Sequence, residues 1–204
     1  MIHSLAGRLA SIFVLYGESS VEDVDIYTYA CEAIISTLVN ITISITILLF
    51  FGRIIDGAIF MLVFTILRKF TGGHHADTHI KCILTFNVIL VCALLISDLL
   101  AASAFENVAV IFIATVSLIG IFVLAPVGNE NKPLDEIWAL FAKKRGRWLT
   151  SALWIICIMD IYILNIQIGF IISLSMFSVF GSLAYAIKYN SASEREVIHY
   201  EKAR

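Results

Sequence analysis

One cysteine of this sequence lies where its thiol could act as a nucleophile. Cys82 opens a long apolar segment and directly follows a polar stretch that contains His74, His75 and His79. A nucleophilic cysteine needs a histidine to accept its proton and nearby cations to stabilise the thiolate. Lys81 adjoins the cysteine in the chain. The stretch therefore predicts acyl-transfer chemistry at Cys82, of the kind that cysteine peptidases perform.

Further residues of the same stretch could support this chemistry. A Gly-Gly pair permits backbone conformations that other residues avoid, and its N–H groups, or those of the following helix start, could form an oxyanion hole. An arginine there could pair with a carboxylate of the substrate or of the protein. An aspartate could orient His75, although residues two apart do not face each other on a helix. These supporting candidates are Arg68, Gly72, Gly73 and Asp77.

Spacing along a helix bears on which histidine is the base. His75 and Cys82 are seven residues apart, so on one straight helix they would be separated by about 10.5 Å along the axis. That distance is too long for a hydrogen bond, so a pair of these two residues requires a bend in the chain. His79 precedes Cys82 by three residues and would lie next to it on a helix. Spacing alone therefore favours His79.

A zinc site is an alternative use of the same residues. On one helix His75, His79 and Cys82 would line a single face, which is a possible zinc ligand set. The spacing of the two histidines matches a zinc-protease helix, but Ala76 stands where that motif has its glutamate. We therefore expect no metal and no other cofactor. A polar turn without any chemistry is a further alternative.

The elements that position these residues are predicted to be membrane helices. The chain has 204 residues, of which 60% are apolar and 15% charged, whereas soluble domains have roughly 25% charged residues. Its mean hydropathy is +0.93. Lipid must therefore cover much of the surface. No basic stripe with interleaved aromatic residues occurs, so nucleic acid is not an expected partner.

Six apolar segments predict an all-α, polytopic membrane protein with about six transmembrane or deeply inserted helices. Residues 1–16 have apolar side chains at helical spacing and predict an interfacial amphipathic helix rather than a signal peptide. We expect a single membrane-embedded domain over residues 1–204, ending in a polar cytoplasmic tail over residues 188–204. The segment from 54 to 67 is short and is expected to be tilted, partial or re-entrant. The six segments are Tyr29–Phe51, Ile54–Leu67, Cys82–Ala102, Val108–Val127, Trp148–Leu164 and Ile168–Ile187.

The distribution of basic residues predicts the orientation. With the N-terminus inside and six crossings, Arg53 is outside and the rest of the 14 basic residues are inside, as the positive-inside rule expects. The loops 68–81 and 128–147 are then cytoplasmic. Asp98 and Asp160 lie within apolar segments, where a carboxylate needs a partner or water. We interpret Asp98 as a helix-end residue at the outer interface, whereas Asp160 could be structural or functional.

The residues around Cys82 resemble the accessory gene regulator B (AgrB) family, membrane endopeptidases of bacterial quorum sensing. The resembling pattern is an arginine, a Gly-Gly pair, one residue, His-Ala, and a cysteine seven residues after that histidine. The later stretches 125–127 and 131–134, the amphipathic start and the chain length are also similar. The pattern is met by Arg68, Gly72, Gly73, His75, Ala76 and Cys82.

The resemblance implies a function that the residues alone do not. It implies that His75 and Cys82 form the catalytic dyad, in place of the His79 that spacing favours. The substrate would be a precursor peptide of the AgrD type, with an amphipathic N-terminal part and an acidic C-terminal tail. A homodimer in the cell membrane would remove the tail on the cytoplasmic side. The acyl-enzyme thioester would then be exchanged for a thiolactone or lactone ring, giving an autoinducing peptide.

A basic cluster gives the acidic tail a possible binding site. Charge attraction would favour that role, although such clusters also set topology and contact anionic lipid. Two functions of other classes remain as alternatives: a zinc-dependent membrane protease and a non-catalytic peptide carrier. Carriers usually show internal repeats, and none is visible. The cluster consists of Lys143, Lys144, Arg145 and Arg147.

Overall fold

A computed structural model describes residues 2–16, 24–73, 78–100, 103, 105–128, 136–164 and 168–202, without the side chains of 2, 12–16, 136, 164 and 191–202. In this part of the chain the regular secondary structure is helical, apart from one isolated bridge. The elements are α1 (Ile2–Tyr16), α2 (Val24–Phe51), α3 (Ile54–Thr71), α4 (His79–Leu100), α5 (Glu106–Leu124), α6 (Glu136–Met159), the π-helical turn η2 (Asp160–Leu164) and α7 (Gly169–Lys202).

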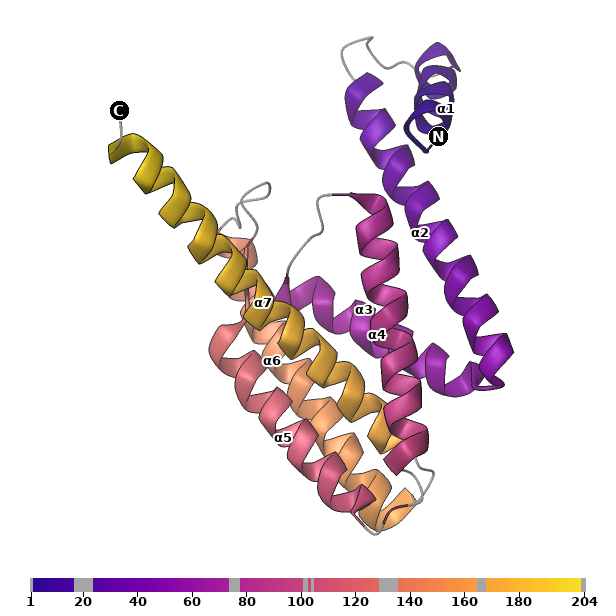
Figure 1. Cartoon of the computed structure of the whole chain (residues 1–204), viewed down its shortest axis with the longest axis vertical. Coiled ribbons are helices and arrows are strands. Elements are labelled where there is room, and N and C mark those ends of the chain that lie inside the picture. The colour runs from indigo at the N-terminus through magenta and orange to yellow at the C-terminus, as the bar shows by residue number, and fades with distance from the viewer. Residues whose placement is uncertain are drawn as a thin grey trace.

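The helices confirm an all-α polytopic membrane protein. Helix α3 has 18 residues, which include Asp56, Arg68 and Lys69. It is therefore too charged to count as an ordinary membrane span. It crosses the molecule obliquely, between the α2–α4 pair and the α5–α6–α7 group (Figure 1). Within the described ranges, the helices long and apolar enough to cross a membrane are Val24–Phe51, His79–Leu100, Glu106–Leu124, Ile137–Ile163 and Gly169–Asn190.

Successive helices from α2 to α7 alternate in direction, so the bundle has two ends with different loops (Figure 1). The Cys82 end carries Gly72–Gly73, Thr78 and the segment 125–128. The opposite end, the Arg53 end, carries the turn between α2 and α3. Arg68 and Lys69 lie in the last turn of α3, Lys81 lies in the first turn of α4, and the basic cluster lies in the first half of α6. This asymmetry agrees with the predicted orientation, and the assignment of the Cys82 end to the cytoplasm stays a prediction.

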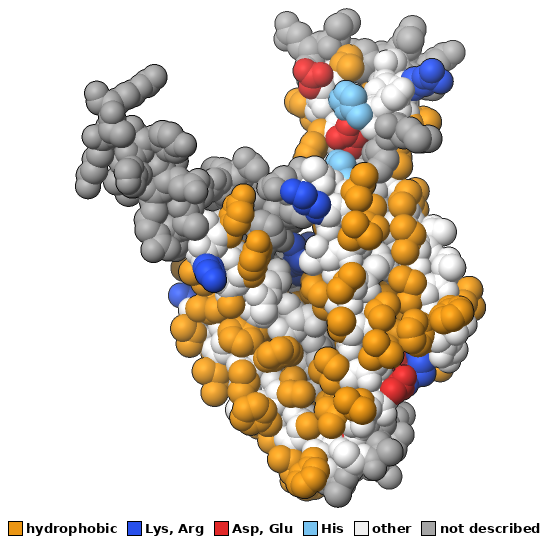
Figure 2. Space-filling view, in the orientation of Figure 1, with side chains coloured by type: hydrophobic (Ala, Val, Ile, Leu, Met, Phe, Trp, Pro, Cys, Tyr) orange, Lys and Arg blue, Asp and Glu red, His pale blue; other side chains and the backbone are white. Residues whose placement is uncertain are grey.

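Helix α7 forms the centre of the bundle. Of its most apolar stretch, 56% is buried, compared with 11% for α2. The Ser175 hydroxyl donates to the Phe60 carbonyl oxygen of α3 at 3.1 Å, so a polar side chain ties the two helices together where no water competes. Large apolar side chains cover the outward faces of the helices (Figure 2), as expected of surface that meets lipid.

The prediction of a loop over residues 128–147 was wrong, because α6 begins at Glu136. Small side chains line one face of the helix: Ala142, Gly146 and Thr150 recur at every fourth position and are buried. A Cβ on Gly146 would lie 3.5 Å from the Thr71 Cγ2 atom, so α6 packs closely on α3 at this stripe. The basic cluster therefore stands on a helix. The predicted tail over 188–204 is likewise helical up to residue 202.

Asp98 and Asp160, the two carboxylates that the sequence analysis singled out, have structural partners. Arg53 donates from Nε to Asp56 at 2.5 Å and also pairs with Asp98, which fastens the α2–α3 turn to the last turns of α4. Asp160 is buried, and its Oδ2 atom accepts from the Gly169 N–H at 2.7 Å. That bond satisfies a free donor at the N-terminus of α7. Asp98 therefore lies at a helix end, as expected, and Asp160 has a structural role.

Candidate active site

Cys82 lies in the first turn of α4, and its side chain is exposed. Thr78 begins the helix: its hydroxyl oxygen accepts from the Lys81 N–H at 3.3 Å, and its carbonyl oxygen accepts from the Cys82 N–H at 3.1 Å. These bonds hold the first turn in place. Cys82 therefore stands at the positive end of the α4 helix dipole.

Arg68, in the last turn of α3, is a cation near Cys82. Its guanidinium and the Cys82 thiol are close enough to interact electrostatically. The guanidinium also lies 5.5 Å from the centre of the Phe64 ring, and that ring packs edge-on against Phe86 with a centroid distance of 5.2 Å. Phe86 follows Cys82 by one helical turn. Aromatic packing therefore joins the part of α3 that carries the arginine to the part of α4 that carries the cysteine.

The backbone conformation at residues 72 and 73 requires glycine. Gly72 has a φ of 77° and Gly73 a φ of 129°, conformations that residues with a side chain rarely adopt. A Cβ on Gly72 would lie 2.1 Å from the Val127 carbonyl oxygen, and one on Gly73 would lie 2.7 Å from the Ser182 Oγ atom. The chain after α3 therefore passes through a space that fits only bare backbone.

The first glycine is unsuited to an oxyanion hole in this conformation. Its N–H already donates to the Arg68 carbonyl oxygen at 3.0 Å, which closes the end of α3. The Gly72–Val127 pair instead forms a parallel bridge, and the Val127 N–H donates to the Thr71 carbonyl oxygen at 3.0 Å. Gly73 stays a candidate donor, together with the first N–H groups of α4.

His75 and Asp77 lie outside the described residues, as do His74 and Ala76. Thr78 is a bend, and α4 begins only at His79. The dyad of His75 with Cys82 and the zinc site of His75, His79 and Cys82 both involve His75, so both stay predictions.

His79 has a partner on another helix. Its Nε2 atom lies 3.5 Å from one carboxylate oxygen of Glu32 in α2, and the other oxygen of that carboxylate lies 2.5 Å from Nδ1 of His3 in α1. Glu32 is half-buried. One carboxylate thus joins the surface helix α1 to the first turn of the helix that carries Cys82.

The basic cluster on α6 contains three exposed residues and one residue that is bonded to another helix. Lys143, Lys144 and Arg145 are exposed. Arg147 is half-buried, donates to the Phe122 carbonyl oxygen at 3.0 Å and lies 5.4 Å from the centre of the Phe122 ring. That carbonyl belongs to the last turn of α5, where a cation is favourable. Arg147 therefore fastens α6 to the end of α5.

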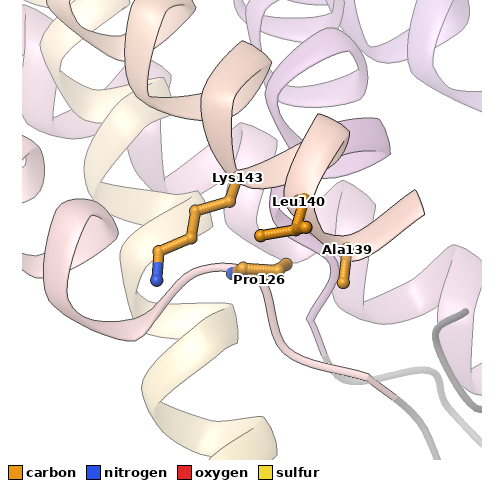
Figure 3. Close-up of a pocket in the computed structure, with 4 residues that line it drawn as sticks. All are labelled: Pro126, Ala139, Leu140 and Lys143. Carbon is orange, nitrogen blue, oxygen red and sulfur yellow. The ribbon is translucent and has the colours of Figure 1, made fainter. Parts of the chain in front are cut away.

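A pocket opens beside the exposed part of this cluster. Its volume is 370 Å³, and it is lined by Pro126, Ala139, Leu140 and Lys143 (Figure 3). Three of these residues give it apolar walls, and the ammonium group of Lys143 supplies a positive charge beside them. The next residue in the chain, Val127, forms the bridge to Gly72. The pocket is thus adjacent to the segment that holds the glycine pair.

Sequence reasoning missed Thr78, Glu32 and Val127. Thr78 carried a readable signal, because a threonine directly before a helical segment is a typical N-cap. Glu32 carried another, because a carboxylate inside an apolar segment usually marks a partner or a site. Val127 lies in the stretch 125–127 that resembles the family, but its contact with Gly72 is made through the tertiary fold and could not be read from the sequence.

Comparison with known proteins agrees with this arrangement. The family model described as accessory gene regulator B matches residues 6–187. The AgrB-like protein 2 of Clostridium perfringens (strain 13 / Type A) is 35% identical over 141 residues, and an AgrB-like protein of strain SM101 is 31% identical over 141 residues. Each match covers 66% of this chain and 62% of the relative, so the chain spans less than two thirds of the length of these relatives. No solved structure gives a significant match. The match of the family model over most of its length identifies this chain as a member of the AgrB family.

Proposed function

We propose that this protein is a membrane cysteine endopeptidase that removes the C-terminal tail of a quorum-sensing precursor peptide and promotes cyclisation of the remainder. The observation that carries the proposal is the exposed Cys82 in the capped first turn of α4, within electrostatic range of the Arg68 guanidinium. A helix N-terminus and a neighbouring cation both favour the thiolate form of a cysteine. The proposed enzyme works as a homodimer in the cell membrane, with the Cys82 end in the cytoplasm.

The proposed reaction has two halves. In the first, Cys82 Sγ attacks the scissile carbonyl, and His75 accepts the thiol proton and passes it to the departing amine, so that a thioester forms and the tail leaves. In the second, a thiol or hydroxyl of the peptide attacks the thioester carbonyl, the C–S bond breaks and the ring closes. The assignment of His75 rests on the family pattern. The membrane surroundings support the second half because they limit hydrolysis of the thioester.

The oxyanion of the first half needs backbone donors near Cys82. The proposed donors are the backbone N–H groups of Gly73, His79 and Ile80. The N–H groups of Gly72 and Lys81 are left out because they already have partners. The free N–H groups at a helix N-terminus suit a negative oxygen.

The pocket beside Lys143 is the proposed binding site for the tail of the peptide. Its apolar walls would hold an apolar side chain, and the ammonium group of Lys143 would attract a carboxylate. Lys144 and Arg145 would add to the attraction, since both are exposed on the same helix. Arg147 is left out of this role because its guanidinium is occupied by Phe122.

The test is a reconstituted cleavage assay. The protein is placed in liposomes with the precursor peptide encoded by the neighbouring reading frame, and peptide mass is followed by mass spectrometry. Cys82→Ser and His75→Ala should abolish tail release, and a chelator should have no effect. Cys92→Ser is the matched control, because Cys92 is also exposed on α4 but lies ten residues further along.

Each other result points to a different function. Tail release that persists in Cys82→Ser would rule out a cysteine nucleophile. Tail release that stops with a chelator would favour the zinc protease. Transfer of intact peptide across the liposome membrane, without any loss of mass, would favour the peptide carrier.

A further inference from the structure

We propose that Glu32 and His79 form a second acid–base pair beside Cys82, and that this pair serves the ring-closing half of the reaction. The inference rests on the proposed function and deepens it. Ring closure needs a base of its own, because the attacking thiol or hydroxyl of the peptide must lose a proton. In this proposal His79 is the base, and Glu32 is the residue that positions it.

The position of His79 beside the thiol follows from α4. His79 is the first residue of the helix and Cys82 lies three residues later. Residues three apart on a helix are neighbours, with Cβ atoms about 5–6 Å apart. A peptide held as a thioester on Cys82 would therefore have its carbonyl carbon within reach of the imidazole. The Thr78 cap keeps this turn helical and so maintains the neighbourhood.

The contact with Glu32 leaves one imidazole nitrogen available. The Nε2 atom faces the Glu32 Oε2 atom at 3.5 Å, so a proton on Nε2 would be donated to the carboxylate and Nδ1 would keep its lone pair. The distance is at the upper limit for a hydrogen bond, and catalytic contacts often shorten only in the substrate complex. This is the arrangement of a general base with an orienting carboxylate.

The other oxygen of Glu32 is held from a third helix. The His3 Nδ1 atom lies 2.5 Å from Oε1, which restricts the carboxylate to one orientation between α1 and α4. Across the described part of the chain, no group of three or more histidine, cysteine, aspartate and glutamate side chains is arranged to hold a metal ion. In this proposal the His3–Glu32–His79 cluster is assigned to proton transfer because both oxygens of one carboxylate face imidazole nitrogens.

The proposed step conserves protons and bonds. The peptide thiol or hydroxyl gives its proton to Nδ1 of His79 as it attacks the thioester carbonyl. The bond between that carbonyl carbon and Cys82 Sγ breaks as the new ester or thioester bond forms. The sulfur leaves as a thiolate and takes the proton back from His79. The products are the cyclic peptide and free Cys82, and no further reactant is needed.

The first test measures the ratio of ring formed to tail released in the liposome assay. His79→Ala and Glu32→Ala should lower this ratio by at least about tenfold, since a general base typically contributes a factor of 10²–10⁴. The missing ring should appear as linear peptide or as acyl-enzyme. Glu32→Asp should recover part of the ratio, and added imidazole should recover part of it in His79→Ala. A residue with a purely structural role would not respond to imidazole.

Asp25→Asn is the matched control. It removes a carboxylate from α2 two turns before Glu32, from an exposed position, and should leave the ratio at its wild-type value. An unchanged ratio in His79→Ala would overturn the proposal while the endopeptidase function stands. Complete loss of tail release in that variant would also overturn it, by assigning His79 to the first half.

A second test does not depend on peptide cleavage. In a Cys92→Ser background, Cys82 is acetylated with an activated acetyl ester, and transfer of the acetyl group to added cysteamine is timed. The His79 and Glu32 variants should slow this transfer by about the same factor as ring closure. If the wild-type chain releases no tail but transfers the acetyl group faster than the variants, the proposed endopeptidase function fails and the acid–base pair stands. Equal transfer rates would overturn the pair.

Discussion

The backbone N–H of Val127 donates to the carbonyl oxygen of Thr71 at 3.0 Å, and this bond joins two stretches that are far apart in the sequence. Both stretches take part in the resemblance to the AgrB family, one through Gly72 and Gly73 and the other through residues 125–127. The second stretch occupies the space that a side chain on Gly72 would need, because a Cβ there would lie 2.1 Å from the Val127 carbonyl oxygen.

Replacing Gly72 with alanine should destabilise the protein and abolish tail release. The new Cβ would lie 2.1 Å from a backbone oxygen at a positive φ, and the cost of such a position is about 1–3 kcal/mol or more. Thermal unfolding in detergent measures the loss. Gly181→Ala is the control, because a Cβ at that position would meet no heavy atom within 4 Å outside its own stretch of helix. Equal unfolding temperatures for the two variants would contradict the prediction.

Removing the Thr78 hydroxyl should loosen the start of α4. Thr78→Ala loses the bond to the Lys81 N–H, and an N-cap is worth about 1 kcal/mol, or about a fivefold change in local opening. Hydrogen exchange at the Lys81 and Cys82 amides should become faster by roughly that factor. Thr78→Ser keeps the acceptor and should exchange as the wild type does. Exchange that is equally slow in both variants would show that the cap is dispensable.

Arg147 and Lys144 should respond in opposite ways to truncation. Arg147→Ala removes the donor to the Phe122 carbonyl oxygen and the cation over the Phe122 ring, and should cost about 1–3 kcal/mol of unfolding free energy. Lys144 is exposed, so Lys144→Ala should change the unfolding free energy little. Urea titration in mild detergent, followed by tryptophan fluorescence, gives both values. A normal stability for Arg147→Ala combined with a raised KM would return Arg147 to the substrate-binding cluster.

Lys143 should affect substrate binding more than stability. Lys143→Glu places a negative charge beside the pocket and should raise KM for a peptide with an acidic tail, with a smaller effect for Lys143→Ala. The effect should weaken as salt is added, because exposed charges are screened at high ionic strength. Peptides whose tail carboxylates are replaced by amides serve as the control. If these peptides lose as much affinity as the acidic ones, the lysine does not read the tail.

A buried polar network should couple α2 to α4. Ser44 donates to the Asn87 Oδ1 atom at 2.9 Å, and Asn87 donates to Asn40 Oδ1 at 2.8 Å. Such contacts are worth about 0.6–2 kcal/mol in membranes. In a double-mutant cycle, Ser44→Ala and Asn87→Ala should be less than additive by a measurable amount, because each removes the same bond. Strict additivity of the two unfolding free energies would exclude the bond as a stabilising contact.

The sequence was sufficient for the fold class because apolar length and charge are local properties. Of the six predicted apolar segments, all but the one from 54 to 67 fall on helices that are long and apolar enough to cross a membrane. The prediction failed at the start of α6, which is too charged to count as an apolar segment. Most residues of that stretch are good helix formers, which agrees with the observed helix. The close approach of Gly146 to Thr71 of α3 is a tertiary contact that the sequence does not reveal.

The sequence predicted which residues belong to the candidate site, but not which of them contact one another. Spacing placed His79 beside Cys82, and the helix start supports that neighbourhood. It could not reveal that Glu32 meets His79, because that contact joins helices far apart in the chain. Nor could it separate Arg147 from the exposed lysines next to it, since only the end of α5 distinguishes them.

The central position of α7 has a consequence for how the protein is made. Helices α2 to α6 leave the ribosome before α7, yet α7 carries the largest buried share of any predicted span. It also supplies Ser182, which lies against Gly73. During synthesis the earlier helices must therefore lie in lipid before their main packing partner has been inserted. The nascent chain consequently holds its cysteine in the membrane before the surrounding backbone is fixed, and cleavage of peptides should begin only after α7 has inserted.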